Sequence, residues 1–271
     1  MLLAGLDPVG ATPPSQNEEF LRGTADVVEL HDVLGTPLDA GEVVLALHPS
    51  WGDQAVVDAL RVVRSSRETL DLVILPVDLP PLALMTAAGL LARLVAQEGA
   101  AHSVVILDRL LECVRTVAWL ETVTRLAHVE VPMRLHTRSL LPGSAFAVSL
   151  SAQQASVAAA DRRDPQLSLP PHNGDWEAVL ARGERGDVAT VERALTSAGW
   201  PKPQTVPASP AAVDWWGTDR YVEVVLYPSA AACRALVAEL PTLHNCRWCS
   251  RATPTEPCVF CGHLSPKETF S

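Results

Sequence analysis

Two pairs of cysteines near the C-terminus are the residues of this chain best suited to chemistry. Cys246 and Cys249 form one C-x-x-C pair, Cys258 and Cys261 form a second, and eight residues separate the pairs. Two thiolates at this spacing can bind one metal ion from a single tight turn, and two such turns supply the four sulfur ligands that Zn²⁺ prefers. The spacing therefore predicts one Zn²⁺, and because four thiolates leave no open coordination position, the metal is expected to be structural.

The segment around these pairs resembles a zinc ribbon. Residues 244–264 contain Cys-Arg-Trp-Cys, a short loop and Cys-Val-Phe-Cys, followed by Gly262 where such a turn favours positive φ. The resemblance implies a small zinc-stabilised module of a kind that often docks on a partner. Two disulfides, free thiols or an iron site are the alternatives that the spacing leaves open.

Four aromatic residues are candidates for contacts with a protein partner. Trp248 and Phe260 lie inside the two C-x-x-C pairs, and Trp215 and Trp216 precede the last expected strand. Large aromatic side chains on a surface commonly anchor interfaces. Packing in the core is the alternative for each of them.

A second set of candidates follows from the expected sheet. His48, Asp78 and Asp108 each end a segment expected to be a strand, and ligands gather at the carboxyl ends of parallel strands. A histidine and two carboxylates there could perform acid–base chemistry or bind a metal. His31 and Asp32 end a further candidate strand. Polar residues that cap the next helix are the alternative. The sequence has no G-x-x-x-x-G-K-[ST], G-x-G-x-x-G or G-x-S-x-G motif.

The elements that would position these residues alternate between strands and helices. Strands are expected over 26–33, 42–48, 72–78 and 103–108, with helices from 53, from 81 to about 97, and from 109 to about 127. This order predicts an α/β fold with a mainly parallel sheet. Alternation over 129–135, followed by an apolar segment at 145–150, predicts an antiparallel edge hairpin. Helices starting at 176, 187 and 229 and a strand over 220–227 then predict a small α+β unit.

These elements suggest a division of the chain into five parts. They are a flexible arm (1–24), an α/β domain (25–150), a linker (151–174), the small α+β unit (175–240) and the zinc-binding tail (241–271).

Composition narrows the class of protein. A net charge of −10 makes nucleic acid an unlikely partner, since phosphate binding needs clustered cations. The first residues lack the basic region of a signal peptide, and the longest apolar run is too short to span a bilayer, so a cytoplasmic protein is expected. Only two of the 21 basic residues are lysines, a bias that suggests a bacterial genome rich in G and C.

The sequence thus favours a cytoplasmic bacterial accessory protein whose structural zinc helps to dock a protein partner. The alternative is a hydrolase or nucleotide-related enzyme that uses His48, Asp78 and Asp108. A third possibility is a nucleic-acid-binding zinc-ribbon protein, which the negative charge disfavours.

Overall fold

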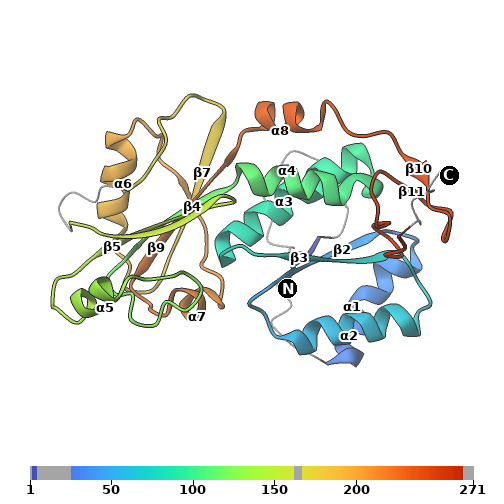
Figure 1. Ribbon diagram of the computed structural model, residues 1–271, viewed down its shortest axis with the longest axis horizontal. Coiled ribbons are helices and arrows are strands. Elements are labelled where there is room, and N and C mark those ends of the chain that lie inside the picture. The colour runs from blue at the N-terminus through green and yellow to red at the C-terminus, as the bar shows by residue number, and fades with distance from the viewer. Residues whose placement is uncertain (1, 5–25, 162–166, 265–271) are drawn as a thin grey trace, which may run out of the picture. The chain divides into compact units, whose positions relative to one another are not determined.

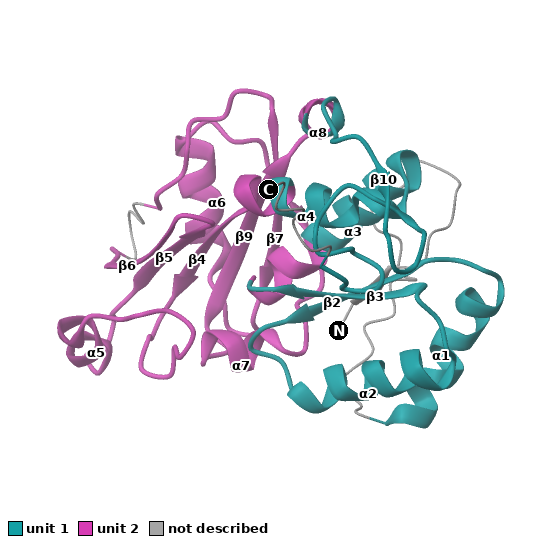
Figure 2. Cartoon of the chain, turned by 45° about the vertical axis from the view of Figure 1, so that its right-hand side comes forward, with its two compact units in different colours: residues 1–78, 87–109, 236–271 teal, residues 79–86, 110–235 magenta. Residues whose placement is uncertain are grey.

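The computed structural model describes residues 2–4, 26–161 and 167–264 (Figure 1). The chain forms two compact units, each assembled from separate stretches of sequence (Figure 2). Unit 1 comprises residues 1–78, 87–109 and 236–271, and unit 2 comprises residues 79–86 and 110–235. These units do not coincide with the contiguous ranges considered above. Apart from Leu2–Ala4, the predicted arm lies outside the described residues.

Unit 1 is built on a three-stranded sheet. Its order is β1 (Leu2–Ala4), β2 (Val44–Pro49), β3 (Leu72–Val77), with β2 and β3 parallel and β1 antiparallel to β2. α1 (Val27–Asp39) and α2 (Gln54–Ser66) lie on one face, and the parts of α3 and α4 that belong to unit 1 lie on the other (Figure 1). α3 is Pro81–Glu98, η1 is Ala100–His102, α4 is Ser103–Cys113, β10 is His244–Asn245 and β11 is Ala252–Thr253.

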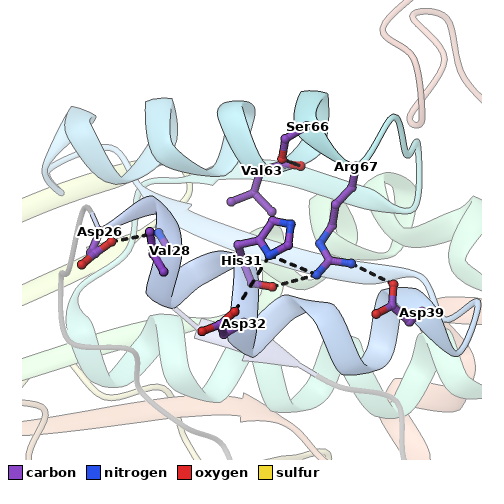
Figure 3. Close-up of polar contacts among 8 residues, drawn as sticks. All are labelled: Asp26, Val28, His31, Asp32, Asp39, Val63, Ser66 and Arg67. Atoms are coloured by element: carbon purple, nitrogen blue, oxygen red, sulfur yellow. Dashed lines mark hydrogen bonds and ion pairs between the residues drawn. The ribbon is translucent and has the colours of Figure 1, made fainter.

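Arg67, directly after α2, joins α2 to α1 (Figure 3). Its guanidinium donates to the carbonyl oxygen of His31 at 3.0 Å and to the Asp39 carboxylate at 2.8 Å. Gly35 gives this group its room, because a Cβ there would lie 2.6 Å from Nη2 of Arg67. The guanidinium of Arg67 therefore joins the two helices and occupies the space that a side chain at position 35 would need.

Unit 2 is built on a six-stranded sheet of order β6-β5-β4-β9-β7-β8, antiparallel except for β7 and β8. α6 packs on one face of β7 and β9, and the first turn of α3 packs on the other. The strands are β4 (Arg115–Leu120), β5 (Phe146–Ser151), β6 (Gln154–Ala159), β7 (Trp176–Arg182), β8 (Gln204–Thr205) and β9 (Tyr221–Pro228). The helices are α5 (Met133–Ser139), α6 (Val188–Ser197), α7 (Ala212–Trp216) and α8 (Ala230–Val237), which extends into unit 1.

Several predicted elements are confirmed. Asp53 caps α2 by accepting from the Ala55 N–H at 2.9 Å, and Asp187 caps α6 at the Thr190 N–H. β3, α3 and β9 also form where the sequence places them. In each case a local apolar pattern indicates the element, and for α2 and α6 a capping aspartate also marks where the helix begins.

Other predictions are wrong, and the prediction of a mainly parallel sheet fails with them. The main sheet is mixed and mostly antiparallel. Residues 27–33 fall in α1, with Asp26 as its N-cap, residues 103–108 fall in α4, and residues 176–180 fall in β7 rather than in a helix. The segment 129–135 is not a strand, because Pro132 is the N-cap of α5. None of the helices in the described ranges is long and apolar enough to cross a membrane.

The segment 103–108 shows why a short apolar run misleads. It was expected to be a buried strand, but burial there recurs at Ser103, Ile106, Leu107 and Leu110, which is the spacing of one helix face. Length alone does not separate the two structures for a run this short. Asp108 therefore lies on an exposed part of a helix and does not end a strand.

Candidate functional site

The four predicted cysteine ligands come together in unit 1. Cys246 and Cys249 lie in the turn between β10 and β11, and Cys258 and Cys261 follow β11. All four Sγ atoms lie within 4.8 Å of one another. Across the two pairs, the Sγ atoms of Cys246 and Cys261 are 3.6 Å apart, and those of Cys249 and Cys258 are 3.7 Å apart.

The backbone repeats one turn at both pairs. The residue directly after each pair donates its N–H to the carbonyl oxygen of the first cysteine, Ser250 to Cys246 at 2.9 Å and Gly262 to Cys258 at 2.8 Å. Each first cysteine donates its own N–H to the carbonyl oxygen five residues later, at 2.9 and 3.0 Å. Ser250 and Gly262 both have positive φ, 60° and 72°. A glycine suits this conformation at Gly262, and Ser250 adopts it as an uncommon non-glycine residue.

The amides of the first turn face its sulfur. Hydrogen bonds from the backbone N–H groups of Cys249 and Trp248 lower the pKa of the Cys246 thiol to about 7. Burial has the opposite effect on Cys261, whose pKa is raised. The first turn therefore stabilises the thiolate of Cys246, the form in which sulfur binds a metal, whereas burial raises the pKa of Cys249 in the same turn.

Two arginine side chains join the tail to the rest of unit 1, Arg251 of the tail and Arg64 of α2. Arg251 donates two hydrogen bonds to the Asp71 carboxylate, at 2.5 and 3.0 Å, and Arg64 donates to the carbonyl oxygen of Phe260. The guanidinium of Arg251 also lies 5.0 Å from the centre of the Phe260 ring. The hydrogen bond from Arg251 lowers the pKa of Asp71. The cysteine cluster thus belongs to unit 1 by its contacts as well as by its position in the chain.

The aromatic partner-binding candidates are mostly buried. Trp248 is 75 % exposed and stacks on His263 with ring centroids 5.5 Å apart, whereas Phe260 is 5 % exposed. In unit 2, Trp215 and Trp216 are buried and meet edge to face. Of the four, Trp248 alone lies on the surface. Its contact with a protein partner stays a prediction.

The predicted group at the strand ends does not assemble as a metal centre. Asp78 follows β3 and accepts a hydrogen bond from the Ser50 hydroxyl at 2.7 Å, while His48 is half-buried on β2, where burial lowers its pKa. Asp108 lies on α4, and His31 and Asp32 lie on α1. Over the described ranges, the cysteine tetrad is the only cluster of three or more His, Cys, Asp or Glu residues placed to bind a metal.

Unit 2 also contains a buried carboxyl group that was not among the residues predicted from the sequence. Glu223 lies on β9 with no exposed surface and accepts hydrogen bonds from Nε1 of Trp216 at 2.9 Å and from the backbone N–H of Leu82 at 3.2 Å. Burial raises its pKa to about 7, although these donors act to lower it. Because Leu82 lies in the first turn of α3, a carboxyl group from the sheet caps this helix. The available signal was one acidic residue within the apolar run from Tyr221 to Leu226.

A pocket of about 460 Å³ opens in unit 2 near the segment that follows α5. Both arginines of its lining are paired with carboxylates. Arg185 donates to Asp219 at 2.7 and 2.9 Å, and Arg220 donates to Glu121 at 2.9 Å. The two arginines and the two carboxylates of the pocket lining therefore balance in charge.

Comparison with known proteins shows the fold. No family model matches the chain, and no curated protein matches it in sequence. The chain is similar in structure to a stearic-acid-binding protein from Eubacterium ventriosum, with a TM-score of 0.54, 9 % identity and 78 % of each chain covered. It is also similar to a DegV lipid-binding protein from Thermotoga maritima, with a TM-score of 0.51, 11 % identity, and 75 % of each chain covered.

A third similar structure is a fatty-acid-binding DegV-family protein from Thermus thermophilus. Its TM-score is 0.50 at 14 % identity, with 75 % of this chain and 77 % of that chain covered. At these identities the likeness shows a shared mixed α/β fold.

This likeness overturns the function expected from the sequence. That hypothesis gave the zinc-ribbon-like tail the central role and left residues 25–240 without a defined task. The shared fold instead covers 78 % of the chain, and the neighbours that have it are described as binding fatty acids or lipids. The predicted function, that of an accessory protein whose structural zinc site helps to dock a protein partner, is therefore wrong.

Proposed function

We propose that this protein binds a long-chain fatty acid. The observation that supports the proposal is the fold that it shares, over 78 % of both chains, with a stearic-acid-binding protein. Two further proteins with TM-scores of 0.50 and 0.51 are described as binding fatty acid or lipid. Because one fold can serve many functions, the ligand itself has to be measured.

The alkyl chain of a fatty acid allows the change in affinity with chain length to be predicted. Each methylene group that a binding site removes from water contributes about 0.8 kcal/mol. A factor of ten in affinity corresponds to about 1.4 kcal/mol, so each lost methylene should weaken binding about fourfold. A series of saturated acids of decreasing length therefore distinguishes an enclosed alkyl chain from an attraction to the carboxylate alone.

The first experiment extracts the purified protein with organic solvent and identifies bound lipids by mass spectrometry. We expect about one long-chain fatty acid per chain. The second titrates delipidated protein with stearate below its micelle concentration and follows thermal unfolding. Stearate at a hundred times its dissociation constant should stabilise the folded protein by about 2.7 kcal/mol.

Two controls define the ligand class. Octanoate should bind far more weakly than stearate, and stearyl alcohol should bind more weakly if a group on the protein recognises the carboxylate. Absence of co-purified fatty acid, together with no saturable stabilisation by stearate, would contradict the proposal.

A further inference from the structure

The tetrad has the spacing of a metal centre. We propose that Cys246, Cys249, Cys258 and Cys261 bind one Zn²⁺, and that this ion fastens the C-terminal segment to α2 and β3 of unit 1. This proposal does not rest on the fatty acid proposed above, because it is argued only from the four cysteines and their contacts within unit 1.

The distances between sulfur atoms support four ligands around one ion. A Zn–S bond of about 2.3 Å in a tetrahedral site places the sulfur atoms about 3.8 Å apart. The distances of 3.6 and 3.7 Å across the two pairs are close to this value. A disulfide would require about 2.0 Å, so these cysteines are arranged as ligands and not as bonded pairs.

The backbone supports the same conclusion independently. The same turn, with the same two hydrogen bonds and with a positive φ at the residue that follows the pair, occurs at both cysteine pairs, although the residues between the cysteines differ. A repeated turn presents two sulfur atoms in the same way from each side. The two turns then complete a closed site without an open position, which fits a structural ion and not a catalytic one.

The surroundings complement the charge of the occupied site. Four thiolates and one Zn²⁺ together carry two negative charges, and Arg251, two residues after Cys249 in the chain, supplies a positive guanidinium. The same guanidinium binds Asp71, directly before β3, and Arg64 of α2 binds the backbone of Phe260. A metal that fixes the two turns would therefore also fix the residues that join the tail to the rest of unit 1.

The first test measures metal in the full-length protein. Elemental analysis should give one zinc per chain, and the cobalt-substituted protein should show the thiolate charge-transfer and d–d bands of a tetrahedral sulfur site. Cys249→Ser should lose the zinc, whereas Cys113→Ser, a cysteine on α4 outside the cluster, should retain it. Protein without metal under reducing conditions, full retention of zinc by Cys249→Ser, or the visible absorption of an iron–thiolate site would overturn the proposal.

The second test measures what the ion does for the tail, and it does not require a variant to fold. A chelator is added to wild-type protein, and hydrogen exchange is followed by mass spectrometry. Residues 244–261 should lose their protection and regain it when zinc is restored, while peptides from β4 and β9 of unit 2 remain unchanged. Unchanged protection of the tail after complete removal of zinc would show that the ion does not fasten it.

Discussion

The cysteine cluster of unit 1 and the Glu223 site of unit 2 hold polar groups in opposite ways. The four thiols come from 16 consecutive residues, Cys246 to Cys261, and two copies of one local turn position them. Glu223 is positioned by contacts distant in sequence, since the backbone N–H that it accepts from Leu82 is 141 residues away. A local cluster can be recognised from spacing, whereas a site made by tertiary packing leaves almost no trace in the sequence.

The two sites also differ in how they satisfy charge. The proposed ion would neutralise the thiolates of two buried and two half-buried cysteines, and Arg251 of the same segment adds a further positive charge. Glu223 has only neutral donors, the Trp216 indole and the first amides of α3. Burial without a cation favours the protonated carboxyl group, which is why its pKa is raised to about 7. The comparison predicts that the carboxyl group of Glu223 makes unit 2 less stable as the pH rises.

The largest expected effect is therefore a dependence of unit 2 stability on pH. Between pH 4.5 and about 7 the folded protein keeps a proton on Glu223 that the unfolded chain releases. The stabilisation is complete below pH 4.5 and is lost as the pH rises through about 7, by about 3 kcal/mol in total. Urea unfolding at pH 5 and pH 8 should show this loss in wild type and much less of it in Glu223→Gln.

Tryptophan fluorescence suits this measurement. Only Trp51 and Trp248 of the seven tryptophans lie in unit 1, so the signal reports mainly on unit 2. Glu177→Gln on the neighbouring strand β7 is the control, because Glu177 is exposed and should leave the pH dependence unchanged. Equal pH dependence of wild type and Glu223→Gln would contradict a proton held at Glu223.

The same contrast explains how far the fold could be predicted. α2 was predicted because Asp53 and the apolar residues Val56, Val57, Leu60 and Val63 lie within one short segment. β7 was not, because its pairing with β9, for example Ala178 with Leu226, depends on residues about 50 positions later. The order of strands in the main sheet, and hence its mixed character, depends on such pairings throughout.

The site residues show the same difference between contacts that are local in the sequence and contacts that are distant in it. The cysteine cluster could be predicted from spacing because the two turns are local. The group of His48, Asp78 and Asp108 required a third parallel strand at 103–108, and that segment is the helix α4. Glu223 could not be assigned a partner, because nothing in the sequence brings the start of α3 to β9.

A smaller effect is expected from replacing a donor to Glu223. Trp216→Phe removes the indole hydrogen bond and leaves a buried carboxyl group with one donor fewer, which should cost about 2 kcal/mol at pH 8. Because this bond lowers the pKa of Glu223, its loss should also move the pH midpoint upward. Trp248→Phe is the matched change at the exposed tryptophan of the tail and should alter stability by less than about 0.5 kcal/mol. If the two variants lose the same free energy of unfolding, the hydrogen bond from the Trp216 indole to Glu223 does not stabilise the folded protein.

The smallest expected effect tests the ion pair that joins the tail to β3. Arg251 and Asp71 form two hydrogen bonds with side chains that are one-third and one-quarter exposed, so solvent weakens their attraction. A double-mutant cycle with Arg251→Gln and Asp71→Asn should give a coupling free energy of about 0.5–1 kcal/mol, measured by hydrogen exchange of the tail. Each variant should keep its zinc, because neither residue is a ligand. Loss of zinc from Arg251→Gln would mean that contacts distant in sequence also position the cysteines. The cysteine cluster and the Glu223 site would then not differ in the way described above.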